Sequence, residues 1–302
     1  MIRVGIDVGV GHVKVVSDIG ELKFPTMLAY FMNTGFNETE TIEYKGQKYT
    51  IGEDARYERN KISISSTADI IKYYPIFQEY VLKKLGLKRE HTVIVTGVPP
   101  NQKSKKDQLK AYCDFVLPQG LGIYIDVQEK ITGRSALILD VGYNTVDYIL
   151  VANGEKKKGE TFEKQGVERI IELFRNHLPN ESEELSKVRQ FPFHKLMECF
   201  LDGSAQVQGK KIDLASYKDR AIQDYNTMLL SRLYEEIDYL LDEVEQIILA
   251  GGGAYYIKNL RSYGVIVPDK PEMAQARGYM KSISKEEDEY EQINITREEV
   301  SV

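Results

Sequence analysis

Two short segments of the chain repeat one pattern, and this repeat constrains the fold more than any other feature. The first segment reads Ile6-Asp7-Val8-Gly9, and the second, more than a hundred residues later, reads Leu139-Asp140-Val141-Gly142. In each copy three turn residues follow the glycine, and then come a valine and a charged residue, Lys14 in the first copy and Asp147 in the second. Similarity at so large a separation indicates a duplicated domain rather than a solenoid.

The repeated unit has a chemistry that follows from its residues. Glycine after a strand-ending aspartate leaves backbone N–H groups open to an anion. Two such turns facing each other would clamp a polyphosphate, and Asp7 and Asp140 beside it would require a cation, for which Mg²⁺ with its retained waters is suited. Lys14 would supply positive charge to the terminal phosphates. A lone Asp-x-Gly hairpin is usually only a tight turn, so it is the second copy that indicates a phosphate site.

A third glycine-rich segment lies near the C-terminus. The apolar run Ile247–Ala250 leads into Gly251, Gly252 and Gly253, after which we expect a helix. Such a turn lets the backbone approach a flat ligand, or places a phosphate at a helix N-terminus. Alone this signal is weak because similar turns also serve packing, but with the two hairpins it completes a nucleotide site.

Strands and helices mix along the whole chain, which predicts the α/β class. Alternating or buried-type apolar patterns predict strands over 2–8, 12–17, 21–25, 92–96, 135–140, 145–152 and 246–250, and a hairpin over 42–51. Helical spacing predicts helices over 67–86, 103–115, 166–178, 217–241 and 271–283. Residues 181–209 are polar and irregular, and the charge-rich end at 284–302 is expected to fray.

Composition excludes several classes of function. The net charge of −6 gives no basic surface for direct nucleic-acid binding. The two cysteines, Cys113 and Cys199, are far apart, so neither a disulfide framework nor a zinc cluster is expected. The N-terminus has no basic leader with an apolar core, and no apolar run reaches the roughly 20 residues of a spanning helix. We therefore expect a cytoplasmic protein.

The order of these segments resembles the superfamily of actins, heat-shock chaperones and sugar kinases. Between the two hairpins lies Pro118-Gln119-Gly120, and after the triple glycine comes Met273-Ala274-Gln275-Ala276-Arg277-Gly278. Within the superfamily the chain is most similar to prokaryotic actins of the plasmid-segregation (ParM or StbA) type and to archaeal actin-like relatives. Thr96-Gly97-Val98-Pro99 resembles a Thr-Gly-Leu-Pro stretch of the plasmid-segregation actins. The resemblance implies a two-domain actin-like (ribonuclease-H-like, duplicated) fold around a nucleotide cleft. Domain I would comprise 1–120 plus 270–302, and domain II 121–269.

The resemblance also assigns roles to residues. Gln119 would orient the attacking water, Asp7 and Asp140 would hold Mg²⁺, and Asp140 and Asp147 would act with Gln119 in catalysis. The residues expected to contact ATP are Gly9, Val10, Gly11, His12, Lys14, Gly142, Tyr143, Asn144, Thr145, Gly166, Gly251, Gly252 and Gly253. Tyr143 departs from the smaller residues of many relatives and could narrow the site.

Several of these residues have plainer interpretations. Gln119 could cap the helix that follows it, and Lys14 could be a solvated strand residue. Asp147 could be an ordinary charge on an edge strand, and His12 fits a turn or core residue better than a catalyst.

The function implied by the resemblance is a Mg²⁺-dependent ATP hydrolase that polymerises with ATP and disassembles after hydrolysis. Its partners would be further copies of itself and a DNA-binding adaptor that links the filament to plasmid DNA. One alternative is a small-molecule kinase of the same superfamily, which would need a further aspartate base. A chaperone-like ATPase would need a peptide-binding domain, and a membrane-anchored actin would need an amphipathic helix, for which neither end gives a signal.

Overall fold

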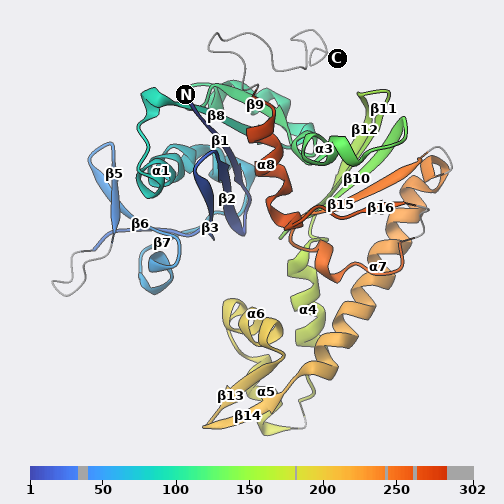
Figure 1. Cartoon of the computed structure of the whole chain (residues 1–302). Coiled ribbons are helices and arrows are strands. Elements are labelled where there is room, and N and C mark those ends of the chain that lie inside the picture. Colours follow the sequence, from blue (N-terminus) through green and yellow to red (C-terminus); the bar gives the residue numbers. More distant parts are fainter. Residues whose placement is uncertain (33–39, 181, 242–243, 261–263, 284–302) are drawn as a thin grey trace. The chain divides into compact units, whose positions relative to one another are not determined.

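The computed structural model describes residues 1–32, 40–180, 182–241, 244–260 and 264–283 (Figure 1). The segment 284–302, which the sequence predicts to fray, lies outside these residues. The chain divides into two compact units: unit 1 comprises Met1–Thr132 and the chain from Pro268 onward, and unit 2 comprises Gly133–Val267. Unit 1 is therefore built from two separate stretches of sequence.

The main sheet of unit 1 has the strand order β3-β2-β1-β8-β9. Its strands are β1 (Ile2–Val8), β2 (His12–Ser17), β3 (Gly20–Pro25), β8 (Thr92–Val98) and β9 (Phe115–Pro118). The first three run antiparallel, whereas β8 and β9 run parallel to β1. The carboxyl ends of β1, β8 and β9 therefore meet at one edge of the sheet, which is where open α/β sheets bind ligands.

A smaller sheet in unit 1 has the order β5-β6-β4-β7. It consists of β4 (Leu28–Tyr30), β5 (Thr41–Tyr44), β6 (Gln47–Ile51) and β7 (Lys61–Ile62). The β5–β6 turn is made by Lys45 and Gly46, both with positive φ, the backbone that a two-residue hairpin favours. Helix α1 (Thr67–Leu85) follows; it begins at Ser66, which forms a capping box with Asp69, and ends at the left-handed Gly86.

Helix α8 (Ala274–Lys281) packs on the main sheet of unit 1 at positions that have no side chain. A Cβ added to Gly5 of β1 would lie 2.7 Å from the backbone nitrogen of Met280, and one on Gly97 of β8 would lie 2.6 Å from Cζ of Tyr279. Real Cβ atoms do not approach other atoms so closely. Glycine at both strand positions is therefore a condition for the helix to lie where it does.

Helix α3 (Leu121–Val127) packs against α8 through a second close approach. A Cβ on Gly122 would lie 2.6 Å from the carbonyl oxygen of Gln275. At the other end of α3 the carboxylate of Asp126, whose side chain is 2% exposed, binds Arg277 at 2.8 and 2.6 Å and Lys281 at 2.8 Å. These contacts place α3 in unit 1, beyond the boundary that the sequence predicted at residue 120.

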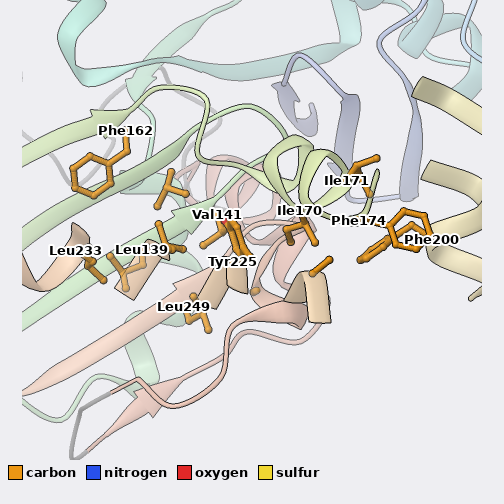
Figure 2. Packing of buried hydrophobic residues seen from close by; sticks show 14 of the residues in the cluster. Leu139, Val141, Phe162, Ile170, Ile171, Phe174, Phe200, Tyr225, Leu233 and Leu249 are labelled. Atoms are coloured by element: carbon orange, nitrogen blue, oxygen red, sulfur yellow. The ribbon is translucent and has the colours of Figure 1, made fainter. Parts of the chain in front are cut away.

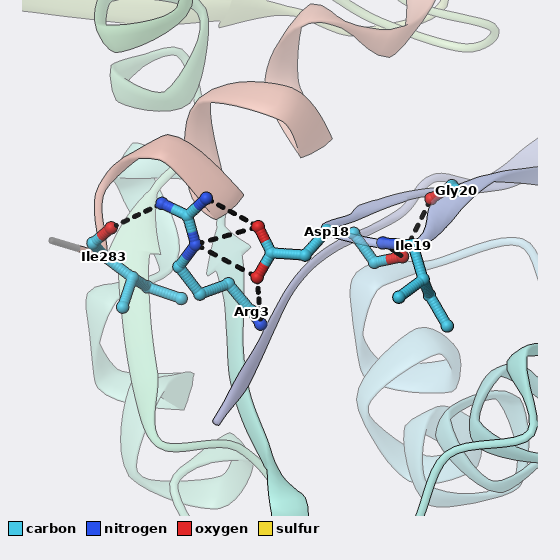
Figure 3. Close-up of polar contacts among 6 residues, drawn as sticks. Arg3, Asp18, Ile19, Gly20 and Ile283 are labelled. Carbon is cyan, nitrogen blue, oxygen red and sulfur yellow. Dashed lines mark hydrogen bonds and ion pairs between the residues drawn. The ribbon is translucent and has the colours of Figure 1, made fainter. Parts of the chain in front are cut away.

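The two stretches of unit 1 are also joined near the start of β1 (Figure 3). The guanidinium of Arg3 donates to Asp18 at 2.6–3.2 Å and to the backbone oxygen of Ile283 at 3.0 Å. The backbone N–H of Arg3 also donates to Asp18, at 2.8 Å. Arg3 thus holds the first strand, the β2–β3 turn and the end of the last helix together.

Unit 2 repeats the same strand arrangement, with the order β12-β11-β10-β15-β16. The strands are β10 (Ser135–Val141), β11 (Val146–Ala152), β12 (Glu155–Phe162), β15 (Gln246–Ala250) and β16 (Val265–Ile266). As in unit 1, the first three strands in chain order form an antiparallel meander, and later strands add in parallel. The duplication predicted from the two short segments therefore extends to the sheets.

Helices α4 (Val167–His177) and α7 (Ala215–Leu241) supply the core of unit 2 beside this sheet (Figure 2). Apolar side chains from the strands and helices form one buried cluster, which includes Leu139, Val141, Leu249, Ile170, Phe174, Tyr225 and Leu233. Between α4 and α7 the chain adds α5 (Glu183–Arg189), α6 (Phe193–Asp202) and a hairpin of β13 (Ser204–Val207) and β14 (Lys210–Asp213). No helix in the described part of the chain is long and apolar enough to span a membrane.

Two predicted helices are wrong, and one long strand was not predicted. The helix predicted over 103–115 is a 3-10 stretch (Pro100–Lys105) and one turn, α2 (Lys106–Leu109), because Asp114 accepts the N–H of Ile94 at 2.7 Å and draws the chain onto the sheet edge. The helix predicted after Gly253 is a single 3-10 turn, Ala254–Tyr256. The lysine-rich edge strand β12 was missed because it lacks the apolar alternation of a half-buried strand.

The packing of α8 gives a test of the fold. Gly5→Ala should lower the free energy of unfolding by about 2–4 kcal/mol, since the added methyl group meets backbone on α8. The matched control is Gly264→Ala, where the nearest atoms lie 3.7 and 3.9 Å from the new Cβ. Urea denaturation of both variants measures the difference; equal stabilities would contradict the packing described.

Candidate functional site

The first predicted turn joins β1 to β2 and closes on itself. The N–H of Gly9 donates to the carbonyl oxygen of His12 at 3.1 Å. Thr26, which follows β3, braces the turn from the side: its hydroxyl donates to the oxygen of Gly9 at 2.6 Å and its N–H to the oxygen of Gly11 at 3.0 Å. Thr26 is buried, so it holds the turn in one shape.

Asp7 and Lys14 lie directly opposite each other on β1 and β2. Nζ of Lys14 donates to Oδ2 of Asp7 at 2.8 Å, and the side chains are only 19% and 9% exposed. The ammonium group lies above the turn, since a Cβ on Gly9 would be 3.4 Å from Nζ. A charge pair shielded from water interacts more strongly than one at the surface, so Lys14 is not a solvated strand residue.

The second predicted turn has the same hydrogen bond. The N–H of Gly142 donates to the carbonyl oxygen of Thr145 at 2.9 Å, which matches the bond from Gly9 to His12. Asp140 and Asp147 are opposite each other on β10 and β11, as Asp7 and Lys14 are in unit 1. The two segments that repeat in sequence therefore also repeat in register and turn geometry.

The two copies differ in the charge of the residue that lies opposite the aspartate. Where unit 1 has Lys14, unit 2 has Asp147, so two carboxylates share one cross-strand position. Asp147 accepts hydrogen bonds from the hydroxyls of Thr145, at 3.0 Å, and Thr161. These bonds orient its carboxylate, which argues against the interpretation of Asp147 as an ordinary edge-strand charge.

The second turn is docked on the first turn of α4. The N–H groups of Gly166, Val167 and Glu168 donate to the carbonyl oxygens of Asn144, Gly142 and Tyr143 at 3.1, 3.0 and 2.9 Å. The N-terminal amides of this helix are thus used within the protein, although helix N-termini are common anion sites. A Cβ on Gly166 would lie 2.5 Å from the carbonyl carbon of Tyr143, so this glycine has a packing reason of its own.

The ring of Tyr143 packs edge-on against Phe193 at the start of α6, with ring centroids 6.4 Å apart and planes at 83°. Burial, with a smaller contribution from the charge of Glu168, raises the pKa of Tyr143 to about 12. Its hydroxyl therefore stays protonated at neutral pH. The side chain ties the second turn to α6.

The three glycines after β15 have different surroundings. Gly251 has φ 82°, and a Cβ there would lie 2.7 Å from the carbonyl carbon of Val141. A Cβ on Gly253 would lie 2.9 Å from Cβ of Val141, and its N–H donates to the oxygen of Val141 at 2.8 Å. Gly252 has nothing within 4 Å of its Cβ position. Close packing against Val141 of β10 thus explains why Gly251 and Gly253 are glycines, but it does not explain Gly252.

Gln119 follows β9 at the carboxyl edge of the main sheet of unit 1, the same edge that carries Asp7 and Gly9. Its N–H donates to the oxygen of Val98 at 2.8 Å. The N-cap residue of α3 is Gly120, with no side-chain capping bond, so the structure gives no support to Gln119 as a cap.

His12 begins β2 and is partly buried. Burial and the positive charges of Lys23, Lys14 and Arg56 lower its pKa to about 4. The imidazole is therefore neutral at pH 7 and adds no positive charge beside Lys14.

Each unit brings part of the predicted set together. Unit 1 holds Asp7, the first turn, Lys14 and Gln119 at one sheet edge, and unit 2 holds Asp140, Asp147, the second turn and the triple glycine. The two aspartates predicted to share one metal ion, Asp7 and Asp140, belong to different units. Within the described residues, no three His, Cys, Asp or Glu side chains form a metal cluster.

Sequence reasoning missed three supporting residues. Thr26 braces the first turn, and Gln275 of α8 accepts the N–H of Gly120 at 2.9 Å. Asn226 of α7 holds the segment after the triple glycine, donating to the oxygen of Tyr256 at 2.7 Å and accepting from the N–H of Lys258 at 2.7 Å. An amide among apolar positions of a helix was the available signal for Gln275 and Asn226.

Because the surroundings of Gly251 and Gly252 differ, alanine at these two neighbouring positions should change the stability of the protein to different extents. Gly251→Ala should lower the free energy of unfolding by about 2 kcal/mol or more, because its positive φ and close contacts exclude a methyl group. Gly252→Ala should change it by less than about 0.5 kcal/mol. Chemical denaturation of both variants checks this, and a large loss in Gly252→Ala would show that its surroundings are closed.

The depressed pKa of His12 predicts a pH dependence. Between about pH 6.5 and 4 the unfolded chain binds a proton that the folded chain does not, so stability falls as the pH is lowered through this window. From pH 6.5 to 5 the wild type should lose about 1–2 kcal/mol more than His12→Gln. Urea titrations of both proteins at both pH values measure this difference. Identical losses of stability in the wild type and His12→Gln would mean that the pKa of His12 is not lowered in the folded state.

Comparison with known proteins agrees with this architecture. A family model described as "Actin like proteins N terminal domain" matches residues 5–132, and one described as "Archaeal actin homologue MreB-like, C-terminal" matches residues 138–262. Among curated protein sequences none matches this chain.

Solved structures share the fold at low identity. The archaeal actin homologue Ta0583 is 18% identical, with a TM-score of 0.78 over 93% of this chain and 99% of that one. A ParM subunit from a 15-stranded filament of Clostridium botulinum is 19% identical, with a TM-score of 0.74 over 93% and 98%. A subunit of the MamK double helical filament is 18% identical, with a TM-score of 0.66 over 93% and 98%. The chain therefore belongs to the actin-like superfamily, with an actin-like N-terminal domain and an archaeal MreB-like C-terminal domain on a two-domain actin-like fold.

Proposed function

We propose that this protein binds and hydrolyses ATP with Mg²⁺, and that its ATP-bound copies assemble into filaments. The observation that carries the proposal is the repeated turn. In each unit an aspartate near the end of a central strand precedes a glycine whose N–H closes the turn onto the third residue after it. Two copies of a glycine turn, each beside an aspartate, are the parts that a polyphosphate clamp requires.

The hydrogen bonds narrow the choice of groups that would contact phosphate. The N–H groups of Gly9 and Gly142 close their own turns, and those of Gly166, Val167 and Glu168 bind the second turn. The phosphates would therefore bind the next amides in each turn, those of Val10 and Gly11 in unit 1 and of Tyr143 and Asn144 in unit 2. His12 and Thr145 would contribute through the shape of the turns.

The donor chemistry fits Mg²⁺ better in unit 2 than in unit 1. Asp140 and Asp147 are cross-strand carboxylates, and Mg²⁺ is commonly held by one or two carboxylates together with substrate phosphates and water. In unit 1, Lys14 already binds Oδ2 of Asp7, so a metal contact from Asp7 would have to use Oδ1. The bound ion would supply charge neutralisation between the carboxylates and the phosphates.

Hydrolysis needs no protein nucleophile, because the attacking group is water and catalysis is largely position and charge. Gln119 would orient the water, and Lys14 would stabilise charge that develops on the terminal phosphate. Asp147, held by two threonine hydroxyls, would accept a proton or fix a second water. Gly252, whose Cβ position is open, would let the backbone approach the nucleotide.

Filament formation is proposed from the fold. Relatives of this fold include a ParM and a MamK whose structures were determined as filaments. An adaptor that links the filament to plasmid DNA in the cytoplasm is proposed from the likeness to ParM.

Light scattering and sedimentation with Mg-ATP, Mg-GTP, Mg-ADP or no nucleotide, with phosphate release followed in parallel, would test the proposal. We expect pelletable polymer with a nucleoside triphosphate only. Asp140→Ala should lower phosphate release about 100-fold and abolish polymer, because it removes one of the paired carboxylates. The control Asp219→Ala alters an exposed aspartate and should behave as wild type.

Gly252→Ala separates binding from folding. It should weaken nucleotide binding about tenfold or more without a matching loss of stability. Phosphate release without polymer at any protein concentration would contradict the filament proposal. Phosphate transfer to an added small-molecule acceptor would instead establish the alternative of a kinase.

A further inference from the structure

Gln275, on the last helix of unit 1, contacts the peptide that follows Gln119. Its side chain is 4% exposed, and its Oε1 accepts the N–H of Gly120 at 2.9 Å in a buried hydrogen bond. Gly120 has φ 86°, a conformation that favours glycine. A helix more than 150 residues away in sequence thus determines how the chain turns after Gln119.

The other side of Gln119 is held by β8. Its own N–H donates to the carbonyl oxygen of Val98 at 2.8 Å. The amides on both sides of the Gln119 Cα are therefore fixed, one by the sheet and one by Gln275. The direction of the Gln119 side chain depends on these two planes, because its Cβ is attached to the Cα between them.

We infer that Gln275 is a positioning residue for Gln119, an inference that rests on the proposed function. By accepting the Gly120 N–H, Gln275 sets the peptide plane after Gln119 and so aims the Gln119 amide at the attacking water. Gln275 itself does not contact the nucleotide or the water. Its effect is on the rate of hydrolysis and leaves nucleotide affinity unchanged.

The surroundings of Gln275 favour this role over plain packing. Its Nε2 is buried and has no hydrogen-bond partner among the described residues, which is unfavourable. An apolar side chain of similar size would avoid that cost. A glutamine at this position is explained by its Oε1, which accepts the hydrogen bond from the Gly120 N–H.

The support behind Gln275 is rigid. The backbone of α8 at Gln275 lies against Gly122 of α3, and Asp126 at the other end of α3 binds both Arg277 and Lys281 of α8. The two helices are therefore fixed to each other at both ends of α3. A side chain mounted on α8 can hold the Gly120 peptide within the few tenths of an ångström that positioning of a water requires.

Gln275→Met tests the inference, because methionine keeps the volume and removes the acceptor. We expect kcat for ATP hydrolysis to fall about 10- to 100-fold, with the Kd for a fluorescent ATP analogue unchanged. The amide of Gly120 should exchange faster with deuterium. Gln275→Glu keeps an acceptor oxygen and should recover part of the rate, and it provides a second variant if Gln275→Met does not fold.

Gln78 offers a matched control in the same unit. It is also a buried glutamine, 6% exposed, and its Nε2 donates to the backbone oxygen of Tyr112 at 2.8 Å. Gln78→Met removes a comparable hydrogen bond from helix α1 and should lower stability with kcat unchanged. A loss of rate in both variants would mean that general loosening, and not positioning, is responsible, and would overturn the inference.

A double-mutant cycle completes the test. Gln119→Ala should lower kcat, and Gln119→Ala/Gln275→Met should equal Gln119→Ala, because Gln275 acts through Gln119. Additive losses, or a wild-type rate in Gln275→Met alone, would overturn the inference and leave the proposed function intact. A wild-type rate in Gln119→Ala would instead remove the catalytic role of Gln119, and with it this inference.

Discussion

Unit 1 depends on the direct contact between helix α8 and the strands β1 and β8. The contact exists because Gly5 and Gly97 carry no side chain where the helix backbone and Tyr279 lie. Hydrophobic packing alone would keep a helix about a side chain further away from the sheet. The close approach brings α8 within reach of α3, so that Gln275 can bind Gly120 and Arg277 and Lys281 can bind Asp126.

The duplication preserves backbone geometry and changes charge. Both units close their turns with the same hydrogen bond, from Gly9 in one and Gly142 in the other. The residue opposite the aspartate is Lys14 in unit 1 and Asp147 in unit 2, so one copy pairs opposite charges and the other places two carboxylates together. The duplicated turns thus place residues of opposite charge, a lysine and an aspartate, at equivalent positions.

The sequence predicted the parts that local patterns determine. The strands, the helices over 67–86, 166–178 and 217–241, and the repeated turns are confirmed because alternation, helical spacing and glycine positions act over a few residues. The helix over 103–115 was wrong because a tertiary contact, the bond from the Ile94 N–H to Asp114, overrides its helical spacing. The partners of residues that support the site from a distance, such as Gln275 and Thr26, could not be predicted from the sequence, since those partners are set by the fold.

The discontinuous make-up of unit 1 has a consequence for the order in which a ribosome would release the protein. The strands of the main sheet of unit 1 are synthesised first. Helix α8, which packs on this sheet at Gly5 and Gly97, can cover it only after the residues that follow Pro268 have been made. Unit 2 is contiguous and has its complete core before that point. The nascent chain would thus contain a finished second unit while the first is still open, the reverse of the usual N-terminal-first order. The bond from Arg3 to Ile283 would be among the last to form.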